Sequence, residues 1–234
     1  MNSNEEKNTT EKGVGVYKTE GVILKKADLT DSDRLLTIYT KKLGKILVRA
    51  KGIGKRESKL KSLIEPFNVY EFLLAKSRTI DVLTNVWPQK EFIYLRANLE
   101  SLSLAIYFAE LVDKLIPAPE PDAKIWALLT RAMEAVDKFN SPQPSLKIRE
   151  EENPPQPSFK KEGVPPFEKG RVGGILTLPN LKTAFEEKLL EFLGHPTFKI
   201  RGKTEPREKQ NYLQSLAGEE INSLRFLGSY LGIG

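Results

Sequence analysis

The chain has 234 residues, of which 39% are hydrophobic and 29% are charged, so it can bury a core and is expected to be globular. It contains no cysteine, which excludes disulfides, thiolate nucleophiles and zinc bound through sulfur. The formal net charge of +6 at pH 7 suits an anionic partner, such as nucleic acid or an acidic protein tail.

Residues 1–15 are polar and charged, and they predict a disordered tail with no signal peptide. No run of 18 apolar residues occurs in the sequence, so no membrane span is expected. We therefore expect a cytoplasmic protein with no membrane partner.

Residues 16–88 show a β-sheet pattern, in which short runs of β-forming residues are separated by turn residues. These runs predict strands at 19–26, 34–40, 45–52, 66–75 and 79–87. Five short strands with one long connection, between the third and the fourth, are typical of a small closed barrel. The five-stranded oligonucleotide-binding (OB) barrel fits this count, although half of a β-sandwich would give a similar pattern.

The period changes after residue 88, and residues 89–140 predict the first part of a helical domain. A helix over 91–116 has its apolar residues three and four apart, at Leu95, Leu99, Leu102, Ile106, Ala109 and Val112. Asp122 is expected to cap a second helix over 123–139. Its apolar residues are Ile125, Leu128, Leu129, Ala132 and Val136.

Residues 141–178 hold seven of the fifteen prolines and have no apolar period, so they predict a disordered insertion rich in proline and glycine. Residues 179–234 complete the helical domain, with a helix over 178–194 packed through Phe185, Leu189 and Phe192 and a last helix over 219–232. The predicted class is α+β, with an N-terminal OB-fold barrel followed by an α-helical domain.

The positive charge is concentrated in one segment. Residues 41–61 carry nine basic residues and one acid, a net +8, so the remainder of the chain sums to −2. Several such groups near phosphates give affinity that is independent of sequence and falls with salt, although a solvated loop is the alternative. The predicted DNA-binding residues are Lys41, Lys42, Lys45, Arg49, Lys51, Lys55, Arg56, Lys59 and Lys61. Gly52 and Gly54 would let the backbone approach a phosphate closely.

Proteins that bind single strands also stack bases on exposed aromatic side chains. The candidates are Tyr39, Phe67, Tyr70 and Phe72, but the alternation along their strands favours core positions for most of them. We therefore expect binding that depends on charge more than on stacking.

No catalytic constellation is present. Asp28, Asp31 and Asp33 are close together but lack the glycine and distal glutamate of a calcium loop, so they predict a solvated turn. His195 is the only histidine, and it supports neither a zinc site nor a catalytic triad. These absences favour a binding protein over an enzyme, with no cofactor, no metal and no small-molecule substrate.

Residues 19–74 resemble the N-terminal domain of the RecO family of bacterial recombination mediators. The resemblance rests on six short elements in order, which are Thr19-Glu20-Gly21, Asp33-Arg34, Thr40 to Gly44-Lys45, Ala50-Lys51-Gly52, Ser58-Lys59-Leu60 and Pro66-Phe67. Later helices are similar to those of the family more loosely.

This resemblance implies an OB barrel, a helical domain and a nucleoid-associated protein without enzymatic activity. Such a protein binds single- and double-stranded DNA, anneals complementary strands and, with RecR and often RecF, helps to load RecA onto strands covered by the single-stranded DNA-binding protein SSB. Many members carry a four-cysteine zinc module after the helix that corresponds to 178–194, which this chain cannot form because it has no cysteine.

Two other functions are compatible with the sequence. In the first, the protein is an interaction module whose basic patch binds an acidic partner, such as the SSB tail. In the second, it is a nuclease, which would need clustered carboxylates for metal ions. The only candidate cluster for a nuclease is the group of aspartates at 28–33.

Overall fold

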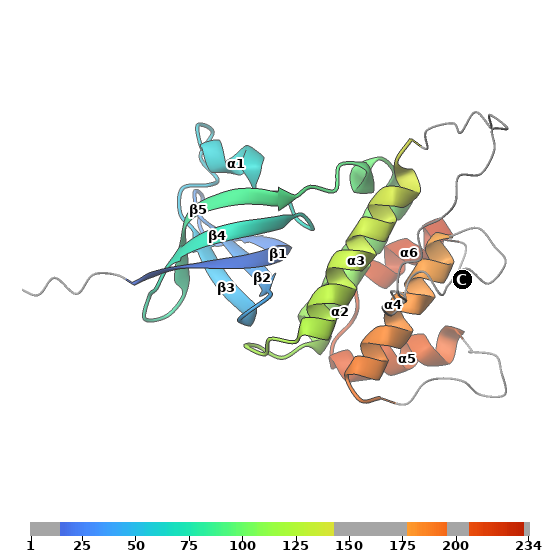
Figure 1. The fold of residues 1–234 in the computed structure, drawn as a ribbon. Helices are drawn as coiled ribbons and strands as arrows, with labels where there is room; N and C mark the ends of the chain where they lie inside the picture. The colour runs from blue at the N-terminus through green and yellow to red at the C-terminus, as the bar shows by residue number, and fades with distance from the viewer. Residues whose placement is uncertain (1–14, 143–176, 196–205, 232–234) are drawn as a thin grey trace, which may run out of the picture.

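The protein is described here from a computed structural model, which covers residues 15–142, 177–195 and 206–231 (Figure 1). A β-barrel lies on one side and a group of helices on the other, with α2 and α3 between the barrel and the remaining helices (Figure 1). The predicted α+β class and the order of barrel and helices are confirmed. The predicted tail and insertion fall almost wholly on residues 1–14 and 143–176, outside the described residues.

All five predicted strands are present, and they close into a barrel in the order β1-β2-β3-β5-β4. Neighbouring strands are antiparallel except β3 and β5, which pair in parallel over two residues. A short helix follows β3. The elements are β1 (Val16–Asp28), β2 (Arg34–Thr40), β3 (Gly44–Ala50), α1 (Lys59–Leu63), β4 (Val69–Ala75) and β5 (Asp81–Lys90).

The barrel buries side chains on both of its faces. Tyr70 and Phe72 belong to the interior, together with residues such as Ile23, Ile38 and Val48. Tyr39 and Phe67 are equally buried but point outward, into the apolar core that the barrel shares with the helices. The prediction that these aromatic side chains are core residues is confirmed, and none of the four offers a stacking platform.

The helices differ from the prediction mainly at their starts. The predicted helix over 91–116 is wrong in its first part, because a 3₁₀ turn and the extended residue Asn98 precede α2. The Asn98 side chain accepts a hydrogen bond from the Ser101 N–H at 2.8 Å and so caps α2. A helix, α5, was not predicted. The elements are η1 (Tyr94–Arg96), α2 (Leu99–Leu115), α3 (Ala123–Asn140), α4 (Leu178–Phe192), α5 (Pro206–Ala217) and α6 (Ser223–Leu231).

Helix α2 is buried over a wider face than its sequence pattern predicts. Leu99 and Ile106, which the pattern placed in the core, are 51% and 42% exposed. Residues between the predicted positions are buried instead, among them Leu104, Tyr107 and Phe108. The reason is that α2 packs against β1 on one side and against α3, α4 and α6 on others, so a single apolar stripe cannot serve all of its neighbours.

Helices α3 and α4 follow the prediction closely. The Asp122 carboxylate caps α3, accepting hydrogen bonds from the N–H groups of Lys124 at 2.6 Å and Ile125 at 3.2 Å. The five apolar residues predicted for this helix are all buried. In α4, Phe185 and Leu189 are fully buried, and the Thr177 side chain caps the first turn. Among the described residues, no helix combines the length and the apolar character needed to cross a membrane.

The β2–β3 turn packs closely against the connection between α2 and α3. Gly44 adopts φ +67°, and a Cβ built there would lie 2.3 Å from the carbonyl carbon of Glu120. The Lys45 Nζ donates to the carbonyl oxygen of Asp113 and lies 3.5 Å from its Oδ1. This end of the barrel is therefore covered by the helical domain.

A buried ionic cluster joins three of the helices. The fully buried Glu186 carboxylate of α4 lies 2.6 Å from Lys182 Nζ and 2.9 Å from Lys209 Nζ of α5. It also accepts a hydrogen bond from the Tyr107 hydroxyl of α2 at 2.6 Å. Burial, followed by the charge of Glu186, raises the pKa of Tyr107 well above its ordinary value, so the hydroxyl stays protonated and keeps donating.

The N-terminus of α6 is held by a carboxylate from α2. Glu110 accepts hydrogen bonds from the N–H groups of Asn222 and Ser223, both at 2.8 Å. Burial raises the pKa of Glu110, but the hydrogen bond from the Ser223 hydroxyl, followed by the two from the N–H groups and the charge of Lys114, outweighs that effect, and the net result is a lowered pKa.

Replacing Gly44 by alanine is expected to destabilise the protein by more than about 1 kcal/mol, because the left-handed backbone disfavours alanine and the new Cβ meets the backbone of Glu120. The measurement is the midpoint of thermal unfolding. Gly52→Ala is the matched control, since Gly52 has a similar φ of +66° but its nearest neighbour to a new Cβ is 3.9 Å away. Equal losses in the two variants would show that the contact with Glu120 is not important.

The attachment of α6 is expected to weaken in acid. Because the folded pKa of Glu110 is lowered, its stabilising effect is complete above the ordinary value of 4.5 and disappears as the pH falls through the folded pKa. Glu110→Gln should lower the free energy of opening α6 by about 1 kcal/mol at pH 7 and remove this pH dependence. Hydrogen exchange of the α6 amides tests both effects, with the exposed Glu100→Gln as a control that should change neither.

Candidate nucleic-acid interface

The nine basic residues predicted to bind DNA do not form one surface. Lys41, Lys42 and Lys45 lie at the end of β3 that faces the helical domain, and residues 51–61 lie at its other end. The seven residues of β3 hold the two groups roughly 20 Å apart. The predicted DNA-binding residues thus fall into two groups at opposite ends of β3, and the prediction that they bind DNA stays a prediction.

The group beside the helical domain is partly used within the molecule. Lys45 is half-buried and binds Asp113 as described above. The Lys41 Nζ lies 3.3 Å from Glu20 Oε2, in an exposed ion pair, while Lys42 is exposed. This end of the barrel offers little free positive charge for a ligand.

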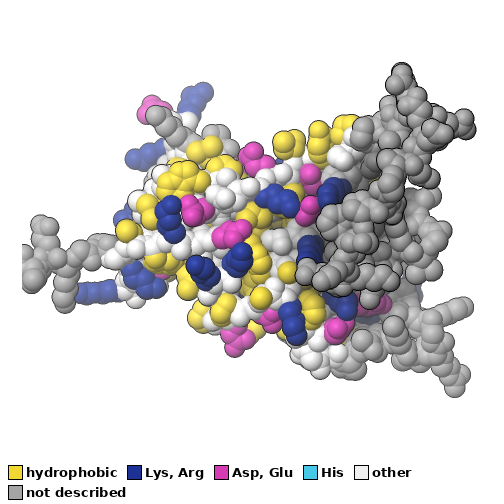
Figure 2. Space-filling view, in the orientation of Figure 1, with side chains coloured by type: hydrophobic (Ala, Val, Ile, Leu, Met, Phe, Trp, Pro, Cys, Tyr) yellow, Lys and Arg dark blue, Asp and Glu magenta, His cyan; other side chains and the backbone are white. Residues whose placement is uncertain are grey.

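The other group forms what we call the basic loop, residues 51–61, which runs from the end of β3 into α1. Lys51, Lys55, Arg56 and Lys61 are exposed, and none of them forms an ion pair with another described residue. The side chain of Lys59 lies outside the described part of the structure. Basic side chains mark the protrusion at the top of the barrel that carries α1 (Figures 1 and 2).

A single carboxylate fixes the start of the basic loop. Asp33, which is 7% exposed, accepts hydrogen bonds from Arg49 Nε at 2.8 Å and Nη2 at 2.6 Å through Oδ2. Its Oδ1 accepts the Gly52 N–H at 2.8 Å. The hydrogen bond from Gly52, followed by the one from Arg49, lowers the pKa of Asp33 below its ordinary value, so the group is a carboxylate at neutral pH. The prediction of a solvated turn is wrong for this residue.

Gly52 and Gly54 hold the basic loop in place through their backbone N–H groups. Gly52 is left-handed and gives its N–H to Asp33, whereas the Gly54 N–H donates to the Ser32 carbonyl at 2.7 Å. A Cβ on Gly54 would lie 2.9 Å from the carbonyl oxygen of Asp31. Both N–H groups are therefore used to join the basic loop to the β1–β2 loop and are not free to donate to a phosphate.

Arg49 is also less available to bind a phosphate than its position in the basic segment suggests. Its guanidinium is held at two nitrogen atoms by the Asp33 carboxylate, and the side chain is 41% exposed. The negative charge of Asp33 offsets its positive charge, so its contribution to any phosphate surface is reduced.

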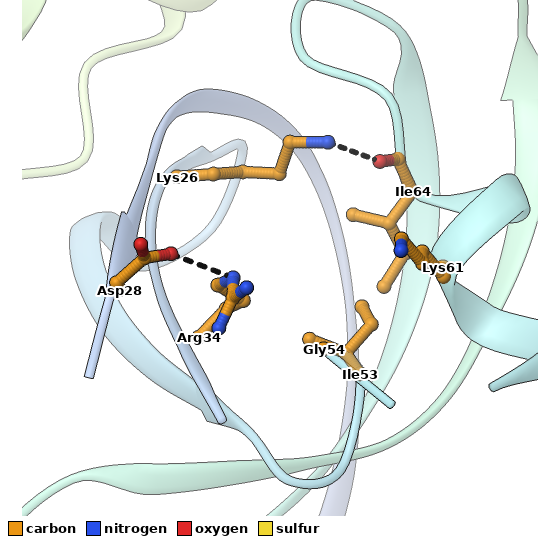
Figure 3. Close-up of a pocket in the computed structure, with 7 residues that line it drawn as sticks. All are labelled: Lys26, Asp28, Arg34, Ile53, Gly54, Lys61 and Ile64. Atoms are coloured by element: carbon orange, nitrogen blue, oxygen red, sulfur yellow. Dashed lines mark hydrogen bonds and ion pairs between the residues drawn. The ribbon is translucent and has the colours of Figure 1, made fainter. Parts of the chain in front are cut away.

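The adjoining ends of β1 and β2 and the segment from Ile53 to Ile64 line a cleft of about 280 Å³ (Figure 3). Its lining residues are Lys26, Asp28, Arg34, Ile53, Gly54, Lys61 and Ile64. Lys26 Nζ donates to the Ile64 carbonyl at 2.8 Å, and Arg34 Nε lies 2.8 Å from Asp28 Oδ1. Sequence reasoning missed Lys26 and Arg34, because they lie outside the basic window, and pairing of β1 with β2 is what brings them beside it.

The described residues contain no group of three or more His, Cys, Asp or Glu side chains that could hold a metal ion. The chain also has no cysteine, so its residues do not fit the four-cysteine zinc module that the resemblance implies for many members of the family. His195 Nδ1 lies 3.0 Å from the Tyr212 hydroxyl, a contact between the end of α4 and α5.

Comparison with known proteins finds a family model and curated relatives that are similar to the barrel. The family described as "Recombination protein O N terminal" matches residues 15–92. The chain is 31% identical to the DNA repair protein RecO of Desulforamulus reducens over 126 residues, which cover 54% of this chain and 49% of the relative. It is 35% identical to the DNA repair protein RecO of Roseiflexus sp. over 122 residues, covering 52% and 43%. The chain thus matches about half the length of these curated relatives.

Replacing Asp33 by asparagine is expected to loosen the basic loop, because the charge that holds Arg49 and the Gly52 N–H is lost. The protection of the Gly52 amide against hydrogen exchange should fall by about tenfold at neutral pH. The neighbouring variant Asp31→Asn is the control, since Asp31 is exposed and its carboxylate should not hold the loop. Unchanged protection in Asp33→Asn would show that the loop is held by its own backbone contacts.

Proposed function

We propose that this protein is a DNA-binding recombination mediator in DNA repair, because residues 15–92 match the model of the RecO N-terminal domain and the relatives that it resembles are DNA repair proteins. In this proposal it binds single- and double-stranded DNA without sequence preference, anneals complementary strands and has no catalytic activity. The observation that carries the proposal is the basic loop, whose four exposed cations have no acidic partner among the described residues.

Cations without intramolecular partners are the groups that can neutralise phosphates. Lys51, Lys55 and Arg56 would each replace counterions at the backbone of single- or double-stranded DNA, and Lys61, which lines the cleft, would do so at the backbone of a single strand. These contacts give affinity without reading the bases. The buried aromatic side chains of the barrel cannot stack on bases, which supports binding by charge. A protein that neutralises phosphates and ignores sequence is suited to annealing any pair of complementary strands.

The position of the helical domain supports DNA binding at the end of the barrel that carries the basic loop. OB barrels commonly bind oligonucleotides on the face of the second and third strands and the adjoining loops. Here Tyr39 of β2 packs into the core shared with the helices, and Lys45 of β3 binds Asp113. The part of that face nearest the helices is therefore covered, while the basic loop is left free for DNA.

The proposed partners are those of the family. They are RecR, possibly with RecF, and the acidic tail of SSB, and the proposed outcome of these contacts is the loading of RecA onto strands covered by SSB. An acidic peptide is also the alternative ligand of the basic loop, because carboxylates and phosphates use the same cations. If a peptide with the acidic tail sequence displaces labelled DNA, the two ligands share the site. If it binds without displacing DNA, it uses another surface.

Reversing two charges of the basic loop tests the proposal. Lys55→Glu together with Arg56→Glu should weaken the binding of a 30-nucleotide oligonucleotide, measured by fluorescence anisotropy over a range of salt concentrations. The slope of log K against log salt should become flatter by about 1.4 for a single strand and about 1.8 for a duplex, the values for two lost phosphate contacts.

The matched control is Lys42→Glu, an exposed lysine at the covered end of the barrel, which should leave both slopes almost unchanged. Unchanged slopes in the double variant would remove the basic loop from the DNA site. If the unmodified protein binds neither form of DNA at low salt, the proposed function is wrong.

A further inference from the structure

We propose that the cleft lined by the adjoining ends of β1 and β2 and by the segment from Ile53 to Ile64 is a subsite for one nucleotide of a single strand of nucleic acid. The inference rests on the proposed function and adds to it. The basic loop attracts any phosphate backbone, whereas this cleft would accept a phosphate together with its sugar and would thereby distinguish a single strand from a duplex.

The cleft carries positive charge that the fold does not fully use. Of its four ionisable lining groups three are cations and one is an acid, so their net charge is +2. Lys61 forms no ion pair with a described residue, and Lys26 uses one donor on the Ile64 carbonyl, which leaves two hydrogens on its ammonium group.

Arg34 supplies the third cation. Its Nε binds Asp28, and its Nη1 donates to the carbonyl oxygens of Thr30 at 3.1 Å and Asp33 at 3.2 Å. Its Nη2 donates to no described residue. These contacts hold the guanidinium in place and leave one edge for a ligand, so that an incoming anion would meet a cation that is already oriented.

The walls of the cleft suit the part of a nucleotide that follows the phosphate. Ile53 and Ile64 provide apolar walls beside the charged groups, and the volume of about 280 Å³ leaves room for a sugar as well as a phosphate. Gly54 keeps this space open, since a Cβ there would lie 2.9 Å from Arg34 Nη1. Cations beside apolar walls in a concave site are the combination expected for a phosphate with an attached organic group.

The concave shape argues for a single strand. In a duplex the bases are paired and stacked inside a convex cylinder, so its phosphates can touch the rim of a cleft while their sugars stay outside it. A single strand has rotatable backbone bonds between its bases and can turn one nucleotide inward. The exposed Lys51, Lys55 and Arg56 have no such enclosure and would contact either form.

The decisive variant is Lys61→Gln, which removes an exposed cation without breaking an ion pair among the described residues. The double variant Lys26→Gln/Lys61→Gln removes a second cation of the cleft. Lys42→Gln is the matched control, with the same chemical change at the covered end of the barrel. Binding of a 30-nucleotide single strand and of the corresponding duplex is measured by fluorescence anisotropy over a salt series, and thermal midpoints verify that each variant folds.

The expected result is a loss of single-strand affinity of about fivefold in Lys61→Gln, with the salt slope flatter by about 0.7. Duplex affinity should change less than twofold, and Lys42→Gln should change neither. If Lys61→Gln and the double variant weaken both forms equally, or weaken neither, the cleft is not a single-strand subsite, while the proposed DNA binding stands. If the unmodified protein binds no DNA, the proposed function fails and this inference fails with it.

Discussion

The packing of the outer barrel face against α2 determines which parts of the barrel can meet a ligand. Val22 and Leu24 of β1, Tyr39 of β2 and Val69 of β4 belong to the same apolar core as the helices. The barrel therefore has two buried faces, one inside and one against α2, and burying both is the main stabilising contribution at this junction. As a consequence, the β2–β3 turn is covered and Lys45 binds Asp113, whereas the opposite end of the barrel remains free.

At that free end, the Asp33 carboxylate organises the charge. It holds Arg49 and the Gly52 N–H, and the Asp33 carbonyl accepts hydrogen bonds from Leu29 and Thr30. One buried acid thus joins the β1–β2 loop to the basic loop, and its contacts link Asp33 of the Asp-Arg pair to Gly52 of the Ala-Lys-Gly segment. A loop held in this way presents its lysines at low entropic cost, because its backbone is ordered before a ligand arrives.

The helical domain uses buried charge in a different way. Glu186 is fully buried between two lysines and the Tyr107 hydroxyl, and so it connects α2, α4 and α5. Buried ion pairs add little net stability, but leaving one partner unpaired is costly, so such a cluster favours a particular arrangement of helices. In a chain without cysteine, this cluster attaches α5 to its neighbours through side chains that need no metal.

The sequence by itself determined the elements whose signals are local. The alternation of residues along the strands predicted that Tyr70 and Phe72 are core residues of the barrel. The capping side chain of Asp122 predicted the start of α3. The distribution of charged residues identified the basic segment. Only the tertiary structure decided which cations are free, because that depends on acids that are distant in sequence, such as Asp33 for Arg49 and Asp113 for Lys45. It also decided the wide buried face of α2 and the cleft beside Lys26, since both arise where elements far apart in the chain are packed together.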